Sequence, residues 1–186
     1  MGSVLLDMAI SLDGFVAGPN GEDRGLYDWY FAPSAPSMLV KDELLQNIGA
    51  MILGRRAFGD EPGGFDTPYH VPHFVLTHAT REPVAREGVT FRFVTEGIEP
   101  ALAQAKAAAG DTVVCVAGGA QTAQQFIKAG LLDEIQLHLV PVLLGVGLRL
   151  FDHTGGQSLH LERTRVIEGA GVTHLRFRCI TARVVR

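Results

Sequence analysis

Residues 113–151, VVCVAGGAQTAQQFIKAGLLDEIQLHLVPVLLGVGLRLF, decide the fold. An apolar run at 113–117 ends in Gly118 and Gly119, a helical pattern follows to Ala129, and a second strand pattern covers 134–140. This order places the first backbone N–H groups of the helix, and the positive end of its dipole, above the end of the first strand. The stretch therefore predicts an anion site near Gly118.

The flanking chain adds further strands and helices. Strands are expected at 4–10, 50–53, 73–77 and 89–95, and a C-terminal hairpin at 159–168 and 172–180. Helices are expected at 37–48 and 100–109. The side chains expected to face the core are Met38, Leu39, Leu44, Leu45 and Ile48 on the first helix, Ala123, Phe126 and Ile127 on the helix after Gly119, and Leu175, Phe177 and Cys179 in the hairpin. The predicted class is α/β, with a mixed, mostly parallel sheet closed by an antiparallel hairpin.

Composition restricts the protein class. At 186 residues, with 47% hydrophobic and 19% charged residues, residues 1–186 are expected to form one packed domain. The net charge of −4 gives no support for a nucleic-acid surface. Cys115 and Cys179 lie in apolar strand patterns, which favours free thiols in a reducing compartment. Without a signal peptide or membrane-span pattern, we expect a soluble, cytoplasmic protein.

Several common chemistries lack their motifs. The seven histidines form no HExxH pattern and no paired His/Cys spacing, so no metal site is expected. No G-x-S-x-G elbow or Walker A pattern occurs, and GVGLRL at 145–150 lacks the third glycine of a dinucleotide fingerprint.

Phosphate-suited residues instead follow three predicted strands. Gly54, Arg55 and Arg56 follow 50–53, Thr77 and His78 end 73–77, and Gly118-Gly119 follows 113–117. Guanidinium groups bind phosphate oxygens in a bidentate manner, and ligands of open α/β sheets bind beyond the carboxyl ends of strands. Three such ends on one edge favour a long polyphosphate ligand such as a dinucleotide.

A long glycine-rich stretch at 11–29, SLDGFVAGPNGEDRGLYDW, separates the first strand from the first helix. Loops of this length in compact domains are usually functional or mobile, which suggests a lid over a pocket. A polar hairpin loop with its carboxylates in water is the equal alternative.

The ordered motifs resemble a known family. ISLDG at 10–14, LGRRAF at 53–58, FVLTH at 74–78, VAGGAQTAQQFIKAGLLDEI at 116–135 and PVLLGVGLRLF at 141–151 resemble the reductase domain of bifunctional riboflavin-biosynthesis deaminase-reductases, and within it the stand-alone dihydrofolate-reductase-like proteins. The resemblance covers nearly the whole chain. It implies a three-layer dihydrofolate-reductase-like fold that binds NADPH across the strand ends and reduces a bound heterocycle.

The resemblance also implies roles for individual residues. The backbone of Ala9 and Ile10 would face the nicotinamide carboxamide, covered by a loop from Ser11 to Gly18. The phosphate and 2′-phosphate contacts would come from Gly54, Arg55, Arg56, Ala57, Thr77 and His78, and the pyrophosphate contacts from Gly118, Gly119, Ala120, Gln121 and Thr122. The family often has Thr in place of Ala57, so one hydroxyl contact is missing.

The sequence offers several candidates for the acid that protonates the substrate. Asp13 is one candidate to orient or protonate the substrate, although an Asx turn before Gly14 explains it equally well. Asp60, in GDEP, resembles the acidic loop of the riboflavin reductases. Dihydrofolate reductases carry an acid on the first helix, where Asp42 and Glu43 are available. Trp29 and Phe65 are candidates for an aromatic wall or for simple core packing.

These features predict an NADPH-dependent reductase of a pyrimidine- or pteridine-like substrate, most specifically 5-amino-6-(5-phosphoribosylamino)uracil. The zinc signatures of the deaminase half are absent from this sequence, so deamination by that route is not expected. Dihydrofolate reduction, and a non-catalytic nucleotide-binding homodimer, are the alternatives. The C-terminal hairpin is the expected homodimer interface.

Overall fold

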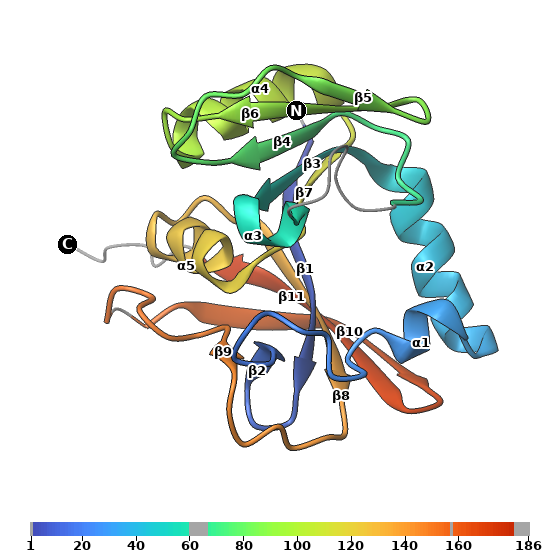
Figure 1. Ribbon diagram of the computed structural model, residues 1–186. Helices are drawn as coiled ribbons and strands as arrows, with labels where there is room; N and C mark the ends of the chain where they lie inside the picture. Colours follow the sequence, from blue (N-terminus) through green and yellow to red (C-terminus); the bar gives the residue numbers. More distant parts are fainter. Residues whose placement is uncertain (1, 60–66, 157, 181–186) are drawn as a thin grey trace.

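The computed structural model describes residues 2–59, 67–156 and 158–180 (Figure 1). The strands are β1 (Val4–Ser11), β2 (Phe15–Ala17), β3 (Ile48–Gly54), β4 (His73–Leu76), β5 (Val84–Arg86), β6 (Val89–Val94), β7 (Val113–Val116), β8 (Glu134–Val140), β9 (Leu148–Arg149), β10 (His160–Gly169) and β11 (Val172–Ile180). The helices are α1 (Asp28–Phe31), α2 (Ala35–Asn47), α3 (Arg55–Phe58), α4 (Ile98–Ala109) and α5 (Ala120–Lys128). Within the described residues, no helix combines the length and the apolar character needed to cross a bilayer.

The main sheet has nine strands in the order β10-β11-β8-β1-β7-β3-β4-β6-β5. The central strand β1 runs parallel to β7 on one side and to β8 on the other, and β3, β4 and β6 continue the parallel pairing. The hairpin β10–β11 joins β8 in antiparallel pairing, and β5 pairs antiparallel with β6 at the other edge. The predicted α/β class, with a mixed, mostly parallel sheet and a C-terminal antiparallel hairpin, is confirmed.

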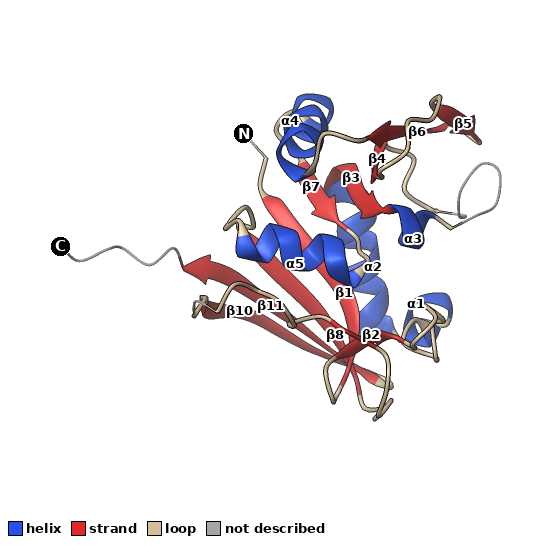
Figure 2. Cartoon of the chain, turned by 60° about the vertical axis from the view of Figure 1, so that its left-hand side comes forward, coloured by secondary structure: helices blue, strands red, loops and turns tan. Residues whose placement is uncertain are grey.

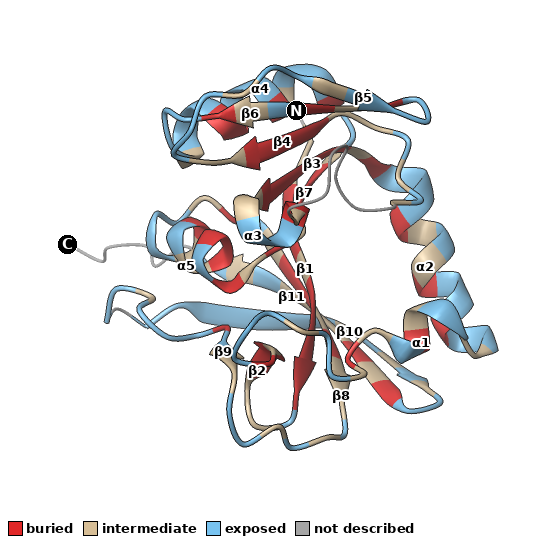
Figure 3. Ribbon diagram, in the orientation of Figure 1, coloured by how far each residue is buried: buried red, intermediate tan, exposed pale blue. Residues whose placement is uncertain are grey.

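Alternation along β1 divides the core between the two faces of the sheet. Val4, Leu6 and Met8 pack with residues of α4 and α5, whereas Leu5 packs with residues of α2. Figure 2 shows α5 across one face of β1 and α2 on the opposite face, and Figure 3 shows the buried central strands between them. Because side chains of a strand alternate between faces, Asp7 belongs to the face that α2 covers.

Helix α2 does not present the face that the sequence predicts. Its buried residues are Ser37, Val40 and Leu44, whereas Met38 and Leu39 have 48% and 69% of their surface exposed. The buried positions are spaced three and four apart, which is the spacing of one helix face. The prediction failed because this face covers a polar part of the sheet, so that a serine, and not a large apolar residue, lies against it.

Two other faces differ from expectation. In β11 the side chain of His174 is buried, while Leu175, Phe177 and Cys179 are half-buried, so burial is not confined to the predicted apolar face of the hairpin. In α5 the buried residues include Thr122, which was expected on an outer face, and Ile127 is half-buried. In both cases a neighbouring element covers the polar residue, as described below.

The glycine-rich stretch after β1 is more regular than a loop. Its residues Phe15–Ala17 form β2, which pairs with β9, and its last residues begin the short helix α1. Between them, the amide of Gly18 donates to the carbonyl of Glu22 at 2.8 Å and forms a tight turn. The stretch is therefore anchored at both ends.

Two buried histidines predict acid sensitivity. Burial lowers the pKa of His73 from 6.5 to about 4, and burial followed by the nearby His138 lowers the pKa of His174 to about 4 as well. Between pH 4 and pH 6.5 the unfolded chain binds more protons than the folded one. The free energy of unfolding should therefore have its full value above pH 6.5 and decrease as the pH is lowered toward 4. For His73 the slope is at most about 1.4 kcal/mol per pH unit.

The measurement is the free energy of urea unfolding between pH 7 and pH 4 for the wild type and His73→Gln. The variant should have lower stability at pH 7 and a shallower loss toward pH 4. His160→Gln, at an exposed histidine, is the control and should keep the wild-type slope. An unchanged slope in His73→Gln would contradict the assignment.

Candidate functional site

A cavity of about 530 Å³ lies where β3, β4 and β6 end and α5 begins. Its lining comes from five separate segments that the fold brings to one edge of the sheet. The lining residues are Gly54, Arg55, Arg56, Leu76, Thr77, His78, Ala79, Val94, Thr95, Gly97, Gly119, Ala120, Gln121, Thr122, Gln125 and Leu148. The three strand ends selected from the sequence therefore converge on one cavity.

The turn between β7 and α5 forms the inner end of this cavity. Gly119 is the N-cap of α5, and no side chain among the described residues caps the N–H groups of the first turn. The amide of Gly54 donates to the carbonyl of Gly118 at 2.8 Å, which joins this turn to the end of β3. The uncapped N–H groups of Ala120 and Gln121 and the helix dipole favour an anion here.

Gly54 permits the close approach of β3 and α5. A Cβ atom on Gly54 would lie 2.7 Å from Oγ1 of Thr122, a distance that would force one of the two apart. Thr122 is buried because it faces this glycine. The glycine of the predicted motif is thus needed for packing as well as for access by a ligand.

The basic side chains of the cavity differ in hydrogen bonding and in exposure. The Nη1 of Arg55 donates to the carbonyl of Gly59, whereas Arg56 and His78 are exposed. Thr77 is half-buried, and its hydroxyl accepts a hydrogen bond from the amide of Ala79 at 3.2 Å. Arg56 and His78 are therefore the side chains best placed to move onto an anionic ligand.

Other predicted cofactor residues lie outside the cavity lining. Ala9 and Ile10 are buried in β1, Gly18 belongs to the turn after β2, and Ala57 is exposed on α3. Gly118 precedes the lining residues, and its peptide bond to Gly119 is cis. The pairing of β1 with β7 ends at Leu6, while its pairing with β8 continues to Ser11. The β7 side of Ala9 and Ile10 thus lies beyond the last pair of β7.

The remaining candidates have different positions. Asp60 and Phe65 lie outside the described residues. Trp29 is buried, and its ring lies 4.3 Å from the ring of His138 and 4.8 Å from that of His174, measured between centroids. It lies on the α2 side of β1, not in the lining of the cavity.

Asp13 is bound on all sides by donors. Its Oδ1 accepts from Ser11 Oγ at 2.6 Å and from the amide of Leu144 at 3.1 Å, and its Oδ2 accepts from the amide of Gly145 at 2.8 Å. The bond from Ser11, followed by the two amide bonds, lowers the pKa of Asp13 to about 2. A carboxylate held ionised in this way links two loops, and it is a poor proton donor at neutral pH.

Sequence reasoning missed Thr95, Gln125 and Leu148 in the cavity lining. Thr95 follows β6 as Thr77 follows β4, so the same strand-end argument would have found it. Gln125 lies one turn after Gln121 on α5, which helical spacing also predicts. Leu148 comes from β9, whose two residues are too short for a periodicity signal.

Sequence reasoning also missed a polar cluster on the opposite side of β1. Asp7, Gln136, Arg176 and Arg165 are cross-strand neighbours on β1, β8, β11 and β10. Asp7 Oδ1 accepts hydrogen bonds from Gln136 Nε2 and from His138 Nε2, each at 3.0 Å. A signal was present in β8 and β11, where polar residues alternate with apolar ones, but not in β1, where Asp7 is the single charged residue.

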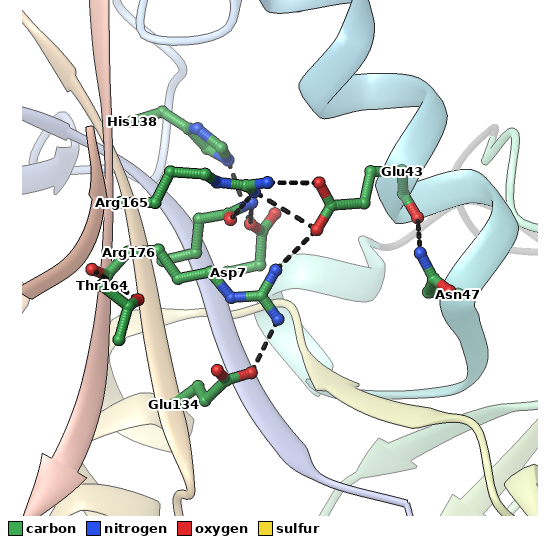
Figure 4. Close-up of polar contacts among 9 residues, drawn as sticks. Asp7, Glu43, Asn47, Glu134, His138, Thr164, Arg165 and Arg176 are labelled. Atoms are coloured by element: carbon green, nitrogen blue, oxygen red, sulfur yellow. Dashed lines mark hydrogen bonds and ion pairs between the residues drawn. The ribbon is translucent and has the colours of Figure 1, made fainter. Parts of the chain in front are cut away.

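Glu43 of α2 closes this cluster. It forms ion pairs with Arg165 and, at 2.7 Å, with Arg176, which also contacts Glu134 at 2.6 Å (Figure 4). Burial raises the pKa of Glu43, but the two arginines outweigh it and leave the pKa below its ordinary value. Asp42 is exposed. Neither helix carboxylate therefore has the environment of a proton donor.

A chain of hydrogen bonds continues from this cluster to α2. His138 Nδ1 lies 2.7 Å from His174 Nδ1, and His174 Nε2 lies 2.9 Å from Ser37 Oγ. Ser37 Oγ lies 3.1 Å from Ser34 Oγ, which accepts from the amide of Ala170 at 3.2 Å. His138, His174 and Ser37 are all buried.

With this geometry established, comparison with known proteins identifies relatives. The family model of the RibD C-terminal domain matches residues 3–175. Two Bacillus subtilis (strain 168) proteins are similar: the uncharacterized protein YyaP is 29% identical over 161 residues, covering 80% of this chain and 79% of YyaP. The uncharacterized protein YwjB is 28% identical over 163 residues, covering 87% and 90%.

Solved structures share the fold. A putative riboflavin biosynthesis protein from Shewanella sp. PV-4 has a TM-score of 0.69 and 24% identity, and the match covers 96% of this chain and 99% of that one. Dihydrofolate reductase from Enterococcus faecalis, complexed with NADP(H) and RAB-propyl, has a TM-score of 0.64 and 16% identity over 97% and 98%. A diaminohydroxyphosphoribosylaminopyrimidine deaminase/5-amino-6-(5-phosphoribosylamino)uracil reductase from Thermotoga maritima has a TM-score of 0.64 and 15% identity. The match covers 96% of this chain and 57% of that one. The predicted dihydrofolate-reductase-like fold is confirmed.

The contact between β3 and α5 generates a stability prediction. Gly54→Ala should destabilise the fold by about 1–3 kcal/mol, because the added methyl group overlaps Thr122 Oγ1. The same substitution in a Thr122→Ala background should cost much less, since the hydroxyl is gone. Urea unfolding of the two single variants and the double variant measures this coupling. Additive effects would show that the two residues do not compete for the same space.

Proposed function

This chain belongs to the RibD C-terminal domain family, and on that premise we propose that it is an NADPH-dependent reductase of a pyrimidine- or pteridine-like substrate. The observation that carries the proposal is the cavity. At one edge of the sheet it brings together arginine side chains, Gly54 at the end of β3 and the uncapped N-terminus of α5. This is the donor set that a dinucleotide with an additional phosphate requires.

The residues present fit this cofactor. The amides of Ala120 and Gln121 would bind the pyrophosphate, while Arg56 and His78 would bind the 2′-phosphate region. A Cβ atom on Gly119 would meet no atom within 4 Å, so the backbone at the helix start is open to a ligand. NADPH, when bound, supplies a hydride to the substrate. The protein contributes binding, orientation and exclusion of water.

The most specific form of the proposal is reduction of 5-amino-6-(5-phosphoribosylamino)uracil. The family and the similarity to reductase structures of riboflavin biosynthesis support this substrate class. Dihydrofolate is the alternative substrate. Against it stands Glu43, the helix carboxylate nearest the sheet, because two arginines hold it as an ion pair. A non-catalytic nucleotide-binding protein is the alternative outside the enzymes.

Thermal unfolding with and without cofactor tests the proposal. NADPH in hundredfold excess over its Kd should stabilise the fold by about 2.7 kcal/mol, and NADH should stabilise it much less. The two nucleotides differ only in the 2′-phosphate of NADPH. Glu96, which accepts a hydrogen bond from the amide of Thr95 at 2.8 Å, would repel this phosphate, so a preference for NADPH requires that Arg56 and His78 outweigh Glu96. The absence of a shift with either nucleotide would contradict the reductase function.

A matched pair of arginine variants locates the binding site. Arg56→Ala should weaken NADPH binding by roughly tenfold or more, because it removes a charge-assisted contact to phosphate. Arg163→Ala, on the exposed edge strand β10, should leave binding unchanged. Rates of NADPH oxidation with the aminouracil ribosyl phosphate and with dihydrofolate then distinguish the two substrates.

We also propose that the chain forms a homodimer through β10. This strand is the edge of the nine-stranded sheet, and it carries Leu161 and Val166 with 39% and 44% of their surface exposed. An open edge with apolar side chains is suited to pairing with a second copy. Light scattering should give twice the chain mass, and Val166→Lys should shift it to the monomer mass. A monomeric wild type would refute the dimer.

A further inference from the structure

We propose that Asp7 is the acid that contacts and protonates the heterocyclic substrate, and that His138, His174, Ser37 and Ser34 form a proton relay connecting it to solvent. This inference rests on the proposed reductase function, and it supplies the proton donor that the function requires. It starts from the hydrogen bonds on the α2 face of the sheet.

The hydrogen bonds of the relay have only one consistent direction while both histidines are neutral and Asp7 is a carboxylate, as it is after giving its proton to the substrate. At one end the amide of Ala170 can only donate, and at the other the carboxylate of Asp7 can only accept. His138 must therefore donate from Nε2 and accept at Nδ1, and His174 must donate from Nδ1 and accept at Nε2. Ser37 then donates to His174, and Ser34 donates to Ser37.

This direction is the one that moves a proton toward Asp7. Each donor passes its proton to the next acceptor, and solvent replaces the proton that Ser34 gives up. Ser34 is half-buried and Ala170 is exposed, so the outer end of the chain reaches the surface at the hairpin turn. His174 is suited to the interior of such a chain, because burial and His138 lower its pKa to about 4 and keep it neutral.

Asp7 also has the position of a substrate contact. Its side chain is 16% exposed, and both hydrogen bonds that it makes within the described part of the chain end on Oδ1. Oδ2 is thus left for a ligand. Asp7 precedes Ala9 by two residues on the same face of β1, next to the backbone that the family resemblance assigns to the nicotinamide.

Aromatic side chains surround this carboxylate. Burial, followed by the charge of Asp7, raises the pKa of Tyr27 to about 12. Burial and then Asp7 likewise raise the pKa of Tyr69. The buried Trp29 lies on the histidines, and its Nε1 has no hydrogen-bond partner among the described residues. A flat heterocycle with polar edges would match such a site, because it offers ring faces and a hydrogen-bond acceptor.

The reaction balances with one hydride and one proton. The hydride supplied under the proposed function goes to the carbon of a C=N or C=O bond, and the π electron pair moves to the nitrogen or oxygen. That atom takes the proton of the Asp7 carboxyl group, which the relay then replaces. Glu43 and Asp13 are not available for this role, because both carboxylate oxygens already accept hydrogen bonds, in Glu43 from arginines and in Asp13 from Ser11 and two amides.

Imidazole spectra test the relay without any cofactor. In ¹⁵N-edited NMR of the unliganded protein at pH 7, His138 should carry its proton on Nε2 and His174 on Nδ1. Ser37→Ala should remove the fixed tautomer of His174, and Ser37→Thr should restore it. The opposite tautomers in the wild type would overturn the relay.

Kinetics test the acid. Asp7→Asn should lower kcat by about 100-fold or more while keeping the thermal shift with NADPH. Ser37→Ala should lower kcat several-fold and increase the solvent deuterium isotope effect, and Ser37→Thr should reverse both changes. Asp42→Asn, on the exposed side of α2, is the control and should behave as the wild type.

The other charged or titratable groups around Asp7 are Tyr27, Tyr30, Glu43, Tyr69, Cys115, Glu134, His138, Arg165, His174 and Arg176. An Asp7→Asn variant that binds NADPH and retains the wild-type kcat would overturn the role of Asp7 as the acid, but not the proposed reductase function. A wild type that binds no NADPH would overturn the proposed function and the acid together.

Discussion

The alternation of side chains along β1 is the constraint on which the rest of the structure depends. Val4, Leu6 and Met8 face the helices α4 and α5, and Leu5 and Asp7 face α2. One strand therefore divides the core between two faces and directs Asp7 into the polar cluster, while the cavity lies at the edge where β3, β4 and β6 end. A shift of register by one residue would bury Asp7 among apolar side chains of α4 and α5 and turn Val4, Leu6 and Met8 toward the polar cluster.

The fold and the cavity were largely predictable because their signals are local. Glycines after β3 and β7, and threonine after β4, each follow an apolar run, and parallel strands bring such ends to one edge. The short elements β2, α3, β5 and β9 left no signal, since they have between two and four residues each. Their existence depends on pairing and packing with partners distant in sequence.

The polar cluster was not predicted, because each of its members has an ordinary explanation when taken alone. A single aspartate in an apolar strand, a histidine in an alternating strand and a serine in a helix become meaningful only when the register of β1, β8 and β11 is known. The same register explains the error on α2. Its inner face carries Ser37 in the first turn because that turn lies against the buried side chain of His174.

The polar cluster also has a consequence for synthesis of the chain. All residues that line the cavity precede residue 150, whereas His174 and Arg176 belong to the last described strand. A nascent chain could therefore assemble the cavity that we propose binds a nucleotide before the hairpin emerges from the ribosome. Under the proposed relay, docking of that hairpin would be the event that converts a binding protein into a catalyst, so that incomplete chains would bind nucleotide without consuming it.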